Sequence, residues 1–275
     1  MRDLLTQAAQ QDMLPAMLIL GKNERRENPA EAYKWFLKAA DSGSPEAMHE
    51  IGMMLASPKG IPGVTEKDES KAFEYFEKAA KKNYAQAVYA LGECYLDGKG
   101  VEKNEGEGMK LIRKAAAAKE VHAMNKLGTR LTRREDPRSL RERKEEFQEA
   151  FNLFTEAGDL GFPDALGNIA VMYFLGYVPG THGPDNTKGA KLFLDGAQKG
   201  STVCMIGYAR CLEQGIGVKP NQLESEKWGR EAARLQNKDA IDWCMEHHYN
   251  VPAFESPSLT GPPQSLGGPQ QSLTQ

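Results

Sequence analysis

Residues 87–101 read AVYALGECYLDGKGV, and this stretch decides the fold. Ala87 is followed four residues later by Leu91, then directly by the small residue Gly92, and three residues further on by Tyr95. Steps of three and four residues place these side chains on one face of a helix. Copies of the pattern begin at Ala16, Ala47, Ala87, Ala123, Ala165 and Cys204, and the last five starts are separated by 40, 36, 42 and 39 residues.

A second pattern follows each copy of the first. In residues 72–80 it consists of Ala72, Tyr75 and the pair Ala79-Ala80. Related sets occur within residues 32–40, 108–116, 150–158, 190–197 and 225–233. Its spacing again indicates a single helical face. We expect the large members of both patterns to lie in the core, and they are Trp35, Tyr75, Tyr95, Tyr173, Phe193 and Trp228.

The alternation of small and large residues indicates how the helices pack. Small residues let two helix axes approach to about 8 Å, and large ones fill the space beside them. We therefore predict that each period is an antiparallel helix pair, A followed by B. One pair cannot bury its own apolar face, so the pairs must stack. Loops such as Gly98-Lys99-Gly100 and Gly215-Ile216-Gly217 join A to B, because glycine permits positive φ.

The string from Ala87 to Val101, followed by Lys114-Ala115-Ala116, resembles the Sel-one-like repeat (SLR) family. This family is related to the tetratricopeptide repeat (TPR) but has a longer loop between its helices. The resemblance covers about residues 1–250 and implies an all-α, right-handed α/α superhelix, which is a TPR-like solenoid. The predicted repeats span 13–43, 44–83, 84–119, 120–161, 162–200 and 201–237.

The two ends of the chain differ from the repeats. Gln7-Ala8-Ala9 matches the end of a B pattern, so we expect the chain to open within a B-type helix, either a short cap or part of a longer repeat protein. Residues 238–249 begin another A pattern and are predicted to form a capping helix. Residues 251–275 are rich in Pro, Gly, Ser and Gln, and too little apolar burial is available there to offset the chain entropy. We predict a disordered tail, with a docking motif as the alternative.

Charge and hydropathy narrow the classes of partner. The 275 residues contain 35 Lys and Arg against 38 Asp and Glu, a net charge of −3. Nucleic acid and anionic membranes favour a clear cationic excess, so neither is expected as a partner. No apolar run approaches the ~18–20 residues of a transmembrane helix. The start of the sequence carries no secretory signal pattern, which predicts an intracellular and most simply cytoplasmic protein, with the mitochondrion as the alternative. The oligomeric state is not indicated.

Motifs for catalysis and metal binding are missing from the sequence. Cys94, Cys204, Cys211 and Cys244 form no CxxC pair and are interpreted as buried thiols. His247-His248 lies near Cys244, but adjacent histidines on a helix point about 100° apart, which favours structural or solvated roles. There is no P-loop and no Gly-x-Ser-x-Gly elbow. The sequence therefore predicts no catalytic residue, no metal site and no cofactor.

An insert in the fourth copy replaces the glycine loop and is rich in arginine. Its arginines are Arg130, Arg133, Arg134, Arg138, Arg141 and Arg143. Such a cluster could bind an acidic partner or a phosphate group. Interleaved acidic residues within 135–146 mostly neutralise it, and no aromatic side chain lies between the arginines to stack on bases. A solvated helix face is therefore favoured over a binding site.

A stack of slightly rotated helix pairs has a long concave face. In TPR relatives, A-helix residues on this face hold peptides, so the resemblance implies a protein or peptide partner here. The equivalent residues are His49, Met53, Tyr89, Glu93, Asn125, Thr129, Val171, Phe174, Ile206 and Arg210. We predict a non-enzymatic adaptor or scaffold that assembles other proteins.

Two alternatives belong to other functional classes. One is a mitochondrial complex assembly factor that uses its cysteines for redox or metal chemistry. It requires cysteines paired between A and B helices, whereas Cys94, Cys204 and Cys211 all fall in A patterns. The other is a hydrolase, as proposed for cysteine-rich SLR proteins, and it requires a nucleophile next to a base.

Overall fold

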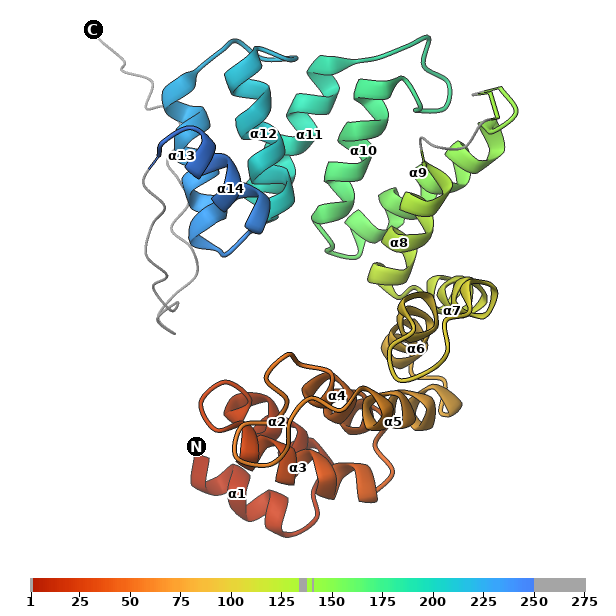
Figure 1. Ribbon diagram of the computed structural model, residues 1–275, viewed down its shortest axis with the longest axis vertical. Helices are drawn as coiled ribbons and strands as arrows, with labels where there is room; N and C mark the ends of the chain where they lie inside the picture. The colour runs from red at the N-terminus through yellow and green to blue at the C-terminus, as the bar shows by residue number, and fades with distance from the viewer. Residues whose placement is uncertain (1, 134–137, 140, 250–275) are drawn as a thin grey trace, which may run out of the picture.

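In the computed structural model, the residues that the structure describes form fourteen α-helices, which follow one another along an open arc (Figure 1). The structure describes residues 2–133, 138–139 and 141–249. Within these ranges there is no β-strand, only an isolated bridge between Ile61 and Thr65. The predicted all-α solenoid is therefore confirmed. The predicted tail, residues 251–275, lies outside the described residues.

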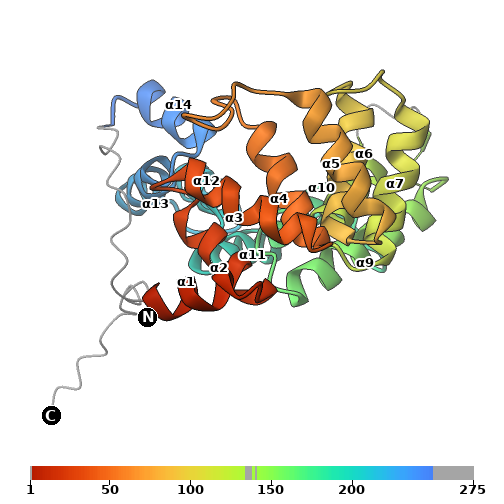
Figure 2. The same cartoon turned by 90° about the horizontal axis from the view of Figure 1, so that it is seen from below.

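The helices alternate between the two predicted types. The A helices are α2 (Leu14–Glu24), α4 (Pro45–Leu55), α6 (Ala85–Asp97), α8 (Val121–Leu131), α10 (Asp164–Leu175), α12 (Thr202–Gln214) and α14 (Lys238–Glu246). The B helices are α1 (Arg2–Gln10), α3 (Pro29–Asp41), α5 (Glu69–Lys81), α7 (Glu105–Ala117), α9 (Lys144–Asp159), α11 (Asn186–Gln198) and α13 (Gln222–Arg234). Each helix packs on its neighbours in sequence. Figure 2 shows the arc from below, with α5, α6 and α7 on one side and α12, α13 and α14 on the other.

Glycines of the A helices receive large side chains from the B helices. A methyl group placed on Gly52 would lie only 2.5 Å from the ring of Phe76. The same close approach joins Gly21 to Phe36 and Gly128 to Phe154. Phe36, Phe76 and Phe154 are almost fully buried. The absence of a Cβ thus lets each ring lie directly on the backbone of the neighbouring helix.

The aromatic residues that fill the core are partly different from those predicted. Phe193 and Trp228 are buried, as expected. Trp35 and Tyr75 are only half-buried, because the adjacent residues Phe36 and Phe76 point at the A helices instead. Lys38 Nζ lies 5.0 Å from the centre of the Trp35 ring, a cation–π contact at the edge of the core.

Tyr95 and Tyr173 are likewise half-buried, so their assignment to the core was also wrong. The ring of Tyr95 packs edge-on against Phe73, with 5.6 Å between the centroids. Lys188 Nζ lies 5.6 Å from the centre of the Tyr173 ring. Both tyrosines therefore border the core without filling it.

Most loops from A to B follow the predicted glycine pattern. Gly98 and Gly100 have φ values of 73° and 70°, and Gly215 and Gly217 have nearly the same values, 70° and 71°. At Gly217 an added Cβ would also lie 2.0 Å from the carbonyl oxygen of Asn186. This turn therefore needs glycine both for its backbone angle and for the close approach of the first residues of α11.

In the fourth repeat, which lacks the glycine loop, the side chain of Arg143 stabilises the connection between α8 and α9. Its guanidinium donates hydrogen bonds of 2.7 Å to the carbonyl oxygens of Leu131 and Arg133. The group also stacks over Phe147 at 4.8 Å and pairs with Glu146 at 3.1 Å. Only 4% of the Arg143 side chain is exposed. A charge buried this deeply is stabilised because its donors are satisfied and a carboxylate lies beside it.

His247 fastens the capping helix α14 to α12. Its Nδ1 lies 2.8 Å from the carbonyl oxygen of Trp243, and its Nε2 lies 2.5 Å from Glu213 Oε1. Both oxygens are acceptors, so both ring nitrogens can donate only when the imidazole is protonated. The Trp243 carbonyl and the Glu213 carboxylate accordingly raise the pKa of His247. The structural role predicted for this histidine is therefore supported.

Replacing Gly52 by alanine should destabilise the protein. Overpacking against Phe76 costs ~1–3 kcal/mol, while the gain in helix propensity is at most ~1 kcal/mol. Gly106→Ala in α7 is the matched control, since the nearest atom to its new methyl group is Asn104 Oδ1 at 3.6 Å. Urea unfolding followed by circular dichroism should show Gly52→Ala less stable than wild type and Gly106→Ala no less stable. Equal behaviour of the two variants would contradict the nesting of ring on glycine.

The stability conferred by His247 should depend on pH. Because its pKa is raised on folding, its contribution is fully present below the unfolded pKa of about 6.5 and is lost as pH rises through the folded value. The melting temperature of wild type should therefore exceed that of His247→Gln at pH 5.5, and the difference should shrink towards pH 8.5. His248→Gln, at an exposed neighbouring position, should follow wild type. A pH-independent difference would show that the imidazolium is not the stabilising form.

Candidate functional site

The A helices gather on the inner side of the arc. Helix α4 contacts α6, and α10 contacts α12, although a B helix separates each pair in the sequence. In a curved stack, alternate helices can touch only where the stack is compressed, which is its concave side. Figure 1 agrees, since α6 lies nearer the hollow of the arc than α7.

Polar side chains connect nearly every A helix to the next. The pairs are Lys22–Glu46 and Arg25–Glu50 between α2 and α4, Glu93–Lys126 between α6 and α8, Asn125–Asn168 between α8 and α10, Asp164–Ser201 between α10 and α12, and Glu213–His247 between α12 and α14. Their closest donor–acceptor distances lie between 2.5 and 3.2 Å. Among the described residues, no ion pair or side-chain hydrogen bond joins α4 to α6.

A hollow of about 410 Å³ lies between α4 and α6, the two neighbouring A helices that no described polar pair joins, and we call it the inner groove. It is lined by His49, Met53, Ala56, Glu69, Ala72, Phe76, Gln86, Tyr89, Ala90, Glu93, Cys94, Lys99, Glu120 and His122. These residues come from α4, α5 and α6, from the loop after α6, and from the start of α8. Aromatic and aliphatic side chains make most of its surface, and its charged members are Glu69, Glu93, Lys99 and Glu120.

His49 brings a buried and unpaired polar atom to the inner groove. Its ring lies 5.7 Å from that of Phe76 and 5.6 Å from that of Tyr84, measured between centroids. Burial, and then the nearby charge of Arg25, lower the pKa of His49 to about 4, so the ring is neutral at physiological pH. Its Nδ1 atom is buried without a hydrogen-bond partner. Leaving such an atom unpaired costs free energy.

Glu93 and Tyr89 form the opposite wall. Glu93 Oε1 is buried and accepts no well-aligned hydrogen bond, although Lys126 Nζ lies 3.2 Å away. Tyr89 stacks on His122 with 5.9 Å between the ring centroids. Burial, and then the carboxylate of Glu93, raise the pKa of the Tyr89 hydroxyl. The tyrosine therefore stays protonated and can donate a hydrogen bond. The groove can accept an apolar side chain and offer polar atoms on two sides of it.

Four of the ten residues predicted for the concave face lie together in the inner groove. They are His49, Met53, Tyr89 and Glu93. Asn125 lies on α8, the next A helix after α6, where its amide oxygen accepts a 2.6 Å hydrogen bond from Asn168. Thr129 is exposed and donates to the carbonyl oxygen of Asn125.

The other four predicted residues are not gathered with the first. Val171 and Arg210 are exposed on α10 and α12. Phe174 packs inward against Gly189 and stacks on Phe193, with 5.6 Å between the ring centroids. Ile206 is only 5% exposed and belongs to the core, which corrects its assignment to a binding face.

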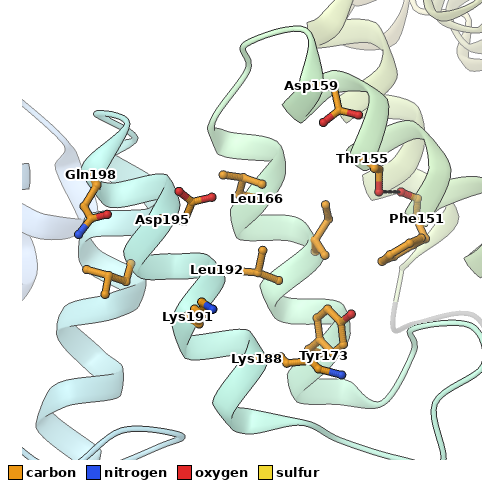
Figure 3. A pocket seen from close by; sticks show the side chains of 12 residues that line it. Phe151, Thr155, Asp159, Leu166, Tyr173, Lys188, Lys191, Leu192, Asp195 and Gln198 are labelled. Atoms are coloured by element: carbon orange, nitrogen blue, oxygen red, sulfur yellow. Dashed lines mark hydrogen bonds between the residues drawn. The ribbon is translucent and has the colours of Figure 1, made fainter.

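A second hollow, of about 670 Å³, lies on the B-helix side and was missed from the sequence; we call it the outer groove (Figure 3). It is lined by Phe151, Thr155, Asp159, Leu166, Ile169, Tyr173, Lys188, Lys191, Leu192, Leu194, Asp195 and Gln198. These residues lie on α9, α10 and α11. In sequence, the apolar residues of this groove cannot be told from core residues. Both kinds recur with the same helical spacing.

The four cysteines are buried free thiols, as predicted. Burial raises the pKa of Cys94, Cys204 and Cys211 to about 11. Within the described part of the chain, no group of three His, Cys, Asp or Glu side chains could hold a metal ion. No described helix is both long enough and apolar enough to span a bilayer.

Three of the six predicted arginines pair with a carboxylate, and one of these three, Arg143, is buried. Arg130 pairs with Glu105, Arg138 pairs with Glu146 at 2.8 Å, and Arg143 is buried. Arg134 lies outside the described residues, while Arg133 and Arg141 are exposed. Arg143 is therefore structural, whereas Arg133, Arg138 and Arg141 lie on the solvated face that the sequence predicted.

The family model described as "Sel1 repeat" matches the chain six times. The matches cover residues 16–44, 45–84, 85–119, 121–162, 163–201 and 202–237. They agree with the order of helices, since each match spans one A helix and the B helix after it.

Two curated proteins are similar to the repeat region. Chitin synthase regulatory factor 2 of Schizosaccharomyces pombe is 29% identical over 188 residues, which is 67% of this chain and 36% of that protein. DAP3-binding cell death enhancer 1 of Rattus norvegicus is 32% identical over 153 residues, 53% of this chain and 29% of that protein. The chain thus spans about a third of the length of these relatives.

Solved structures share the fold. A Sel1 repeat protein from Oxalobacter formigenes has 28% sequence identity and a TM-score of 0.66, over 83% of this chain and 89% of that one. The protective antigen c5321 of uropathogenic Escherichia coli, described as having an SLR fold, has 24% identity and a TM-score of 0.57, over 89% of this chain and 50% of that one.

The four thiols should react slowly in the folded protein. With pKa values of about 11 for three of them, only about one thiol in a thousand is ionised at pH 8. We expect DTNB to modify the folded chain at least about 100-fold more slowly than the chain in guanidinium, where all four should react. A thiol that reacted equally fast in both states would revive a redox role for the cysteines.

Proposed function

Because the chain belongs to the Sel1 repeat family, we propose that it is an adaptor that holds a segment of another protein in its inner groove. The observation that carries the proposal is the unpaired step between α4 and α6. Other neighbouring A helices are joined by polar pairs, whereas α4 and α6 enclose a mainly apolar hollow, lined in part by His49, whose Nδ1 atom is unpaired. The names of the relatives, a regulatory factor and a binding protein, support an interaction role.

The groove favours a peptide that inserts one apolar side chain. The half-buried Ala90 and the 41%-exposed Met53 provide contact surface for this side chain. Next to it, the protonated hydroxyl of Tyr89 would donate a hydrogen bond to a carbonyl group of the peptide. His49 Nδ1 and Glu93 Oε1 are already desolvated, and a polar group of the peptide would satisfy them if a rotation of their side chains exposed them to the groove.

The hydrolase alternative is not supported by the groove. Cys94 is the thiol that lines it, but burial raises the pKa of this thiol to about 11. His49 also lines the groove, but burial lowers its pKa to about 4, which makes it too weak a base to deprotonate that thiol. A cysteine nucleophile needs a thiolate, which this environment disfavours.

Assembly of complexes in mitochondria remains a narrower alternative. A mitochondrial role that depends on redox or metal chemistry requires paired cysteines. The four cysteines are instead separate buried thiols, namely Cys94, Cys204, Cys211 and Cys244. An adaptor role inside mitochondria without cysteine chemistry would use the same groove. Fractionation of cells that express the full-length protein would decide between the cytoplasmic and mitochondrial locations.

A single charge in the inner groove should abolish partner binding. Met53→Glu places a carboxylate at the rim, where an apolar contact would be lost and Glu93 would repel it. Affinity capture with quantitative mass spectrometry should show the proteins enriched by wild type reduced at least about tenfold. Val64→Glu is the control, because Val64 is similarly exposed, at 48%, but lies in the loop between α4 and α5.

Neither substitution should change the fold. Circular dichroism of both variants should match wild type, since both side chains are exposed. A captured set that is unchanged in Met53→Glu, or equally reduced in Val64→Glu, would mean that the inner groove is not the binding site.

A further inference from the structure

The outer groove lies over a seam in the apolar core. The buried residues form two clusters, one reaching from α1 to the loop after α10 and the other from α10 to α14. Leu166 and Leu192 are half-buried, and each packs against both clusters. They form the floor of the outer groove, as Figure 3 shows. The two core clusters are therefore separated from solvent here by side chains that remain partly exposed.

The charges around the outer groove are segregated. Figure 3 shows Asp159 and Asp195 towards one end, and Lys188 and Lys191 towards the other. Asp195 pairs with Lys199 at 3.0 Å, and Lys188 pairs with Asp185 at 3.4 Å. Asp159 and Lys191 have no charged partner among the described residues. One free negative and one free positive charge thus mark opposite ends of an apolar channel.

The dipoles of α9 and α11 add to this polarity, while the dipole of α10, which runs in the opposite direction, subtracts from it. Asp159 is the last residue of α9, and Asp195 lies in the last turn of α11. The C-terminal end of a helix carries a partial negative charge, so the acidic end of the groove is more negative than its side chains alone make it. Lys188 and Lys191 lie in the first half of α11 and reinforce the opposite sign at the other end.

We propose that the outer groove binds an amphipathic helix of a partner protein, running antiparallel to α9 and α11. Its apolar stripe would cover Leu166 and Leu192, as one helix packs between two others. Its N-terminal turn, with a basic side chain, would lie beside Asp159, and its last turn, with an acidic side chain, would lie beside Lys191. This orientation pairs each end of the incoming dipole with charges of opposite sign.

The proposal goes beyond the adaptor function and stands without it. The outer and inner grooves have no residue in common, and they lie on α9–α11 and α4–α8. A chain with both grooves could hold two partners at once. Each site can therefore be tested with the other one blocked.

Two fluorescein-labelled model helices of identical composition test the orientation. Both carry leucine at positions i, i+3, i+4 and i+7; one has lysines in its first turn and glutamates in its last, and the other has the reverse order. The reverse order is the more helical in isolation, so helicity alone would favour it. Fluorescence anisotropy should show the lysine-first peptide binding about fivefold more tightly to wild type, as expected for two exposed charge pairs.

The variant Asp159→Lys/Lys191→Glu should invert that preference, since it exchanges the two free charges at exposed positions. Met53→Glu should leave both affinities unchanged, because it alters only the inner groove. The proposal is overturned if neither peptide binds wild type below about 1 mM, if the preference survives the charge exchange, or if Met53→Glu weakens binding. Analytical sedimentation without peptide tests whether a second copy of the chain fills the groove. If wild type forms a dimer and the charge-exchange variant does not, the occupant is a second copy and the proposal of a partner helix is overturned.

Discussion

The approach of aromatic rings to glycine backbones is the contact on which the arc depends. Phe76 lies so close to Gly52 that even one methyl group would collide with it, and Gly21 and Gly128 receive rings in the same manner. Such contacts bring A and B helices nearer than side chains on both would allow. Repeating one close contact at nearly constant spacing also repeats the angle between helix pairs, and a constant angle produces a continuous curve.

Curvature in turn creates two unlike faces. On the inner face the A helices come within reach of each other, and polar pairs such as Arg25–Glu50 and Asn125–Asn168 fix their spacing. Where α4 meets α6, no such pair is present among the described residues, and a mainly apolar hollow lies there, lined in part by His49, whose Nδ1 atom has no hydrogen-bond partner. On the outer face the B helices diverge, which leaves Leu166 and Leu192 partly uncovered between α9 and α11.

Periodicity alone was sufficient to predict the helix pairs, the glycine turns and the buried thiols, because each depends on local spacing or residue type. It could not decide which of two adjacent aromatics turns inward, so Trp35 and Tyr75 were placed in the core instead of Phe36 and Phe76. Helix rotation, set by neighbours distant in sequence, makes that choice. For the same reason register predicted His49 and Tyr89 on the groove but misplaced Ile206 and missed the outer groove, which three separate helices build.

A repeat array suits an adaptor because its contacts are local. Each helix pair touches mainly its neighbours, so an occupant of one groove perturbs the stack only over the adjacent repeats. The inner groove is centred on α4 to α6 and the outer groove on α9 to α11, and the buried Arg143 fixes the α8–α9 connection that lies between them. Two partners bound at these places would be held at a fixed distance with little coupling of their affinities, so the arc would act as a spacer and not as a switch.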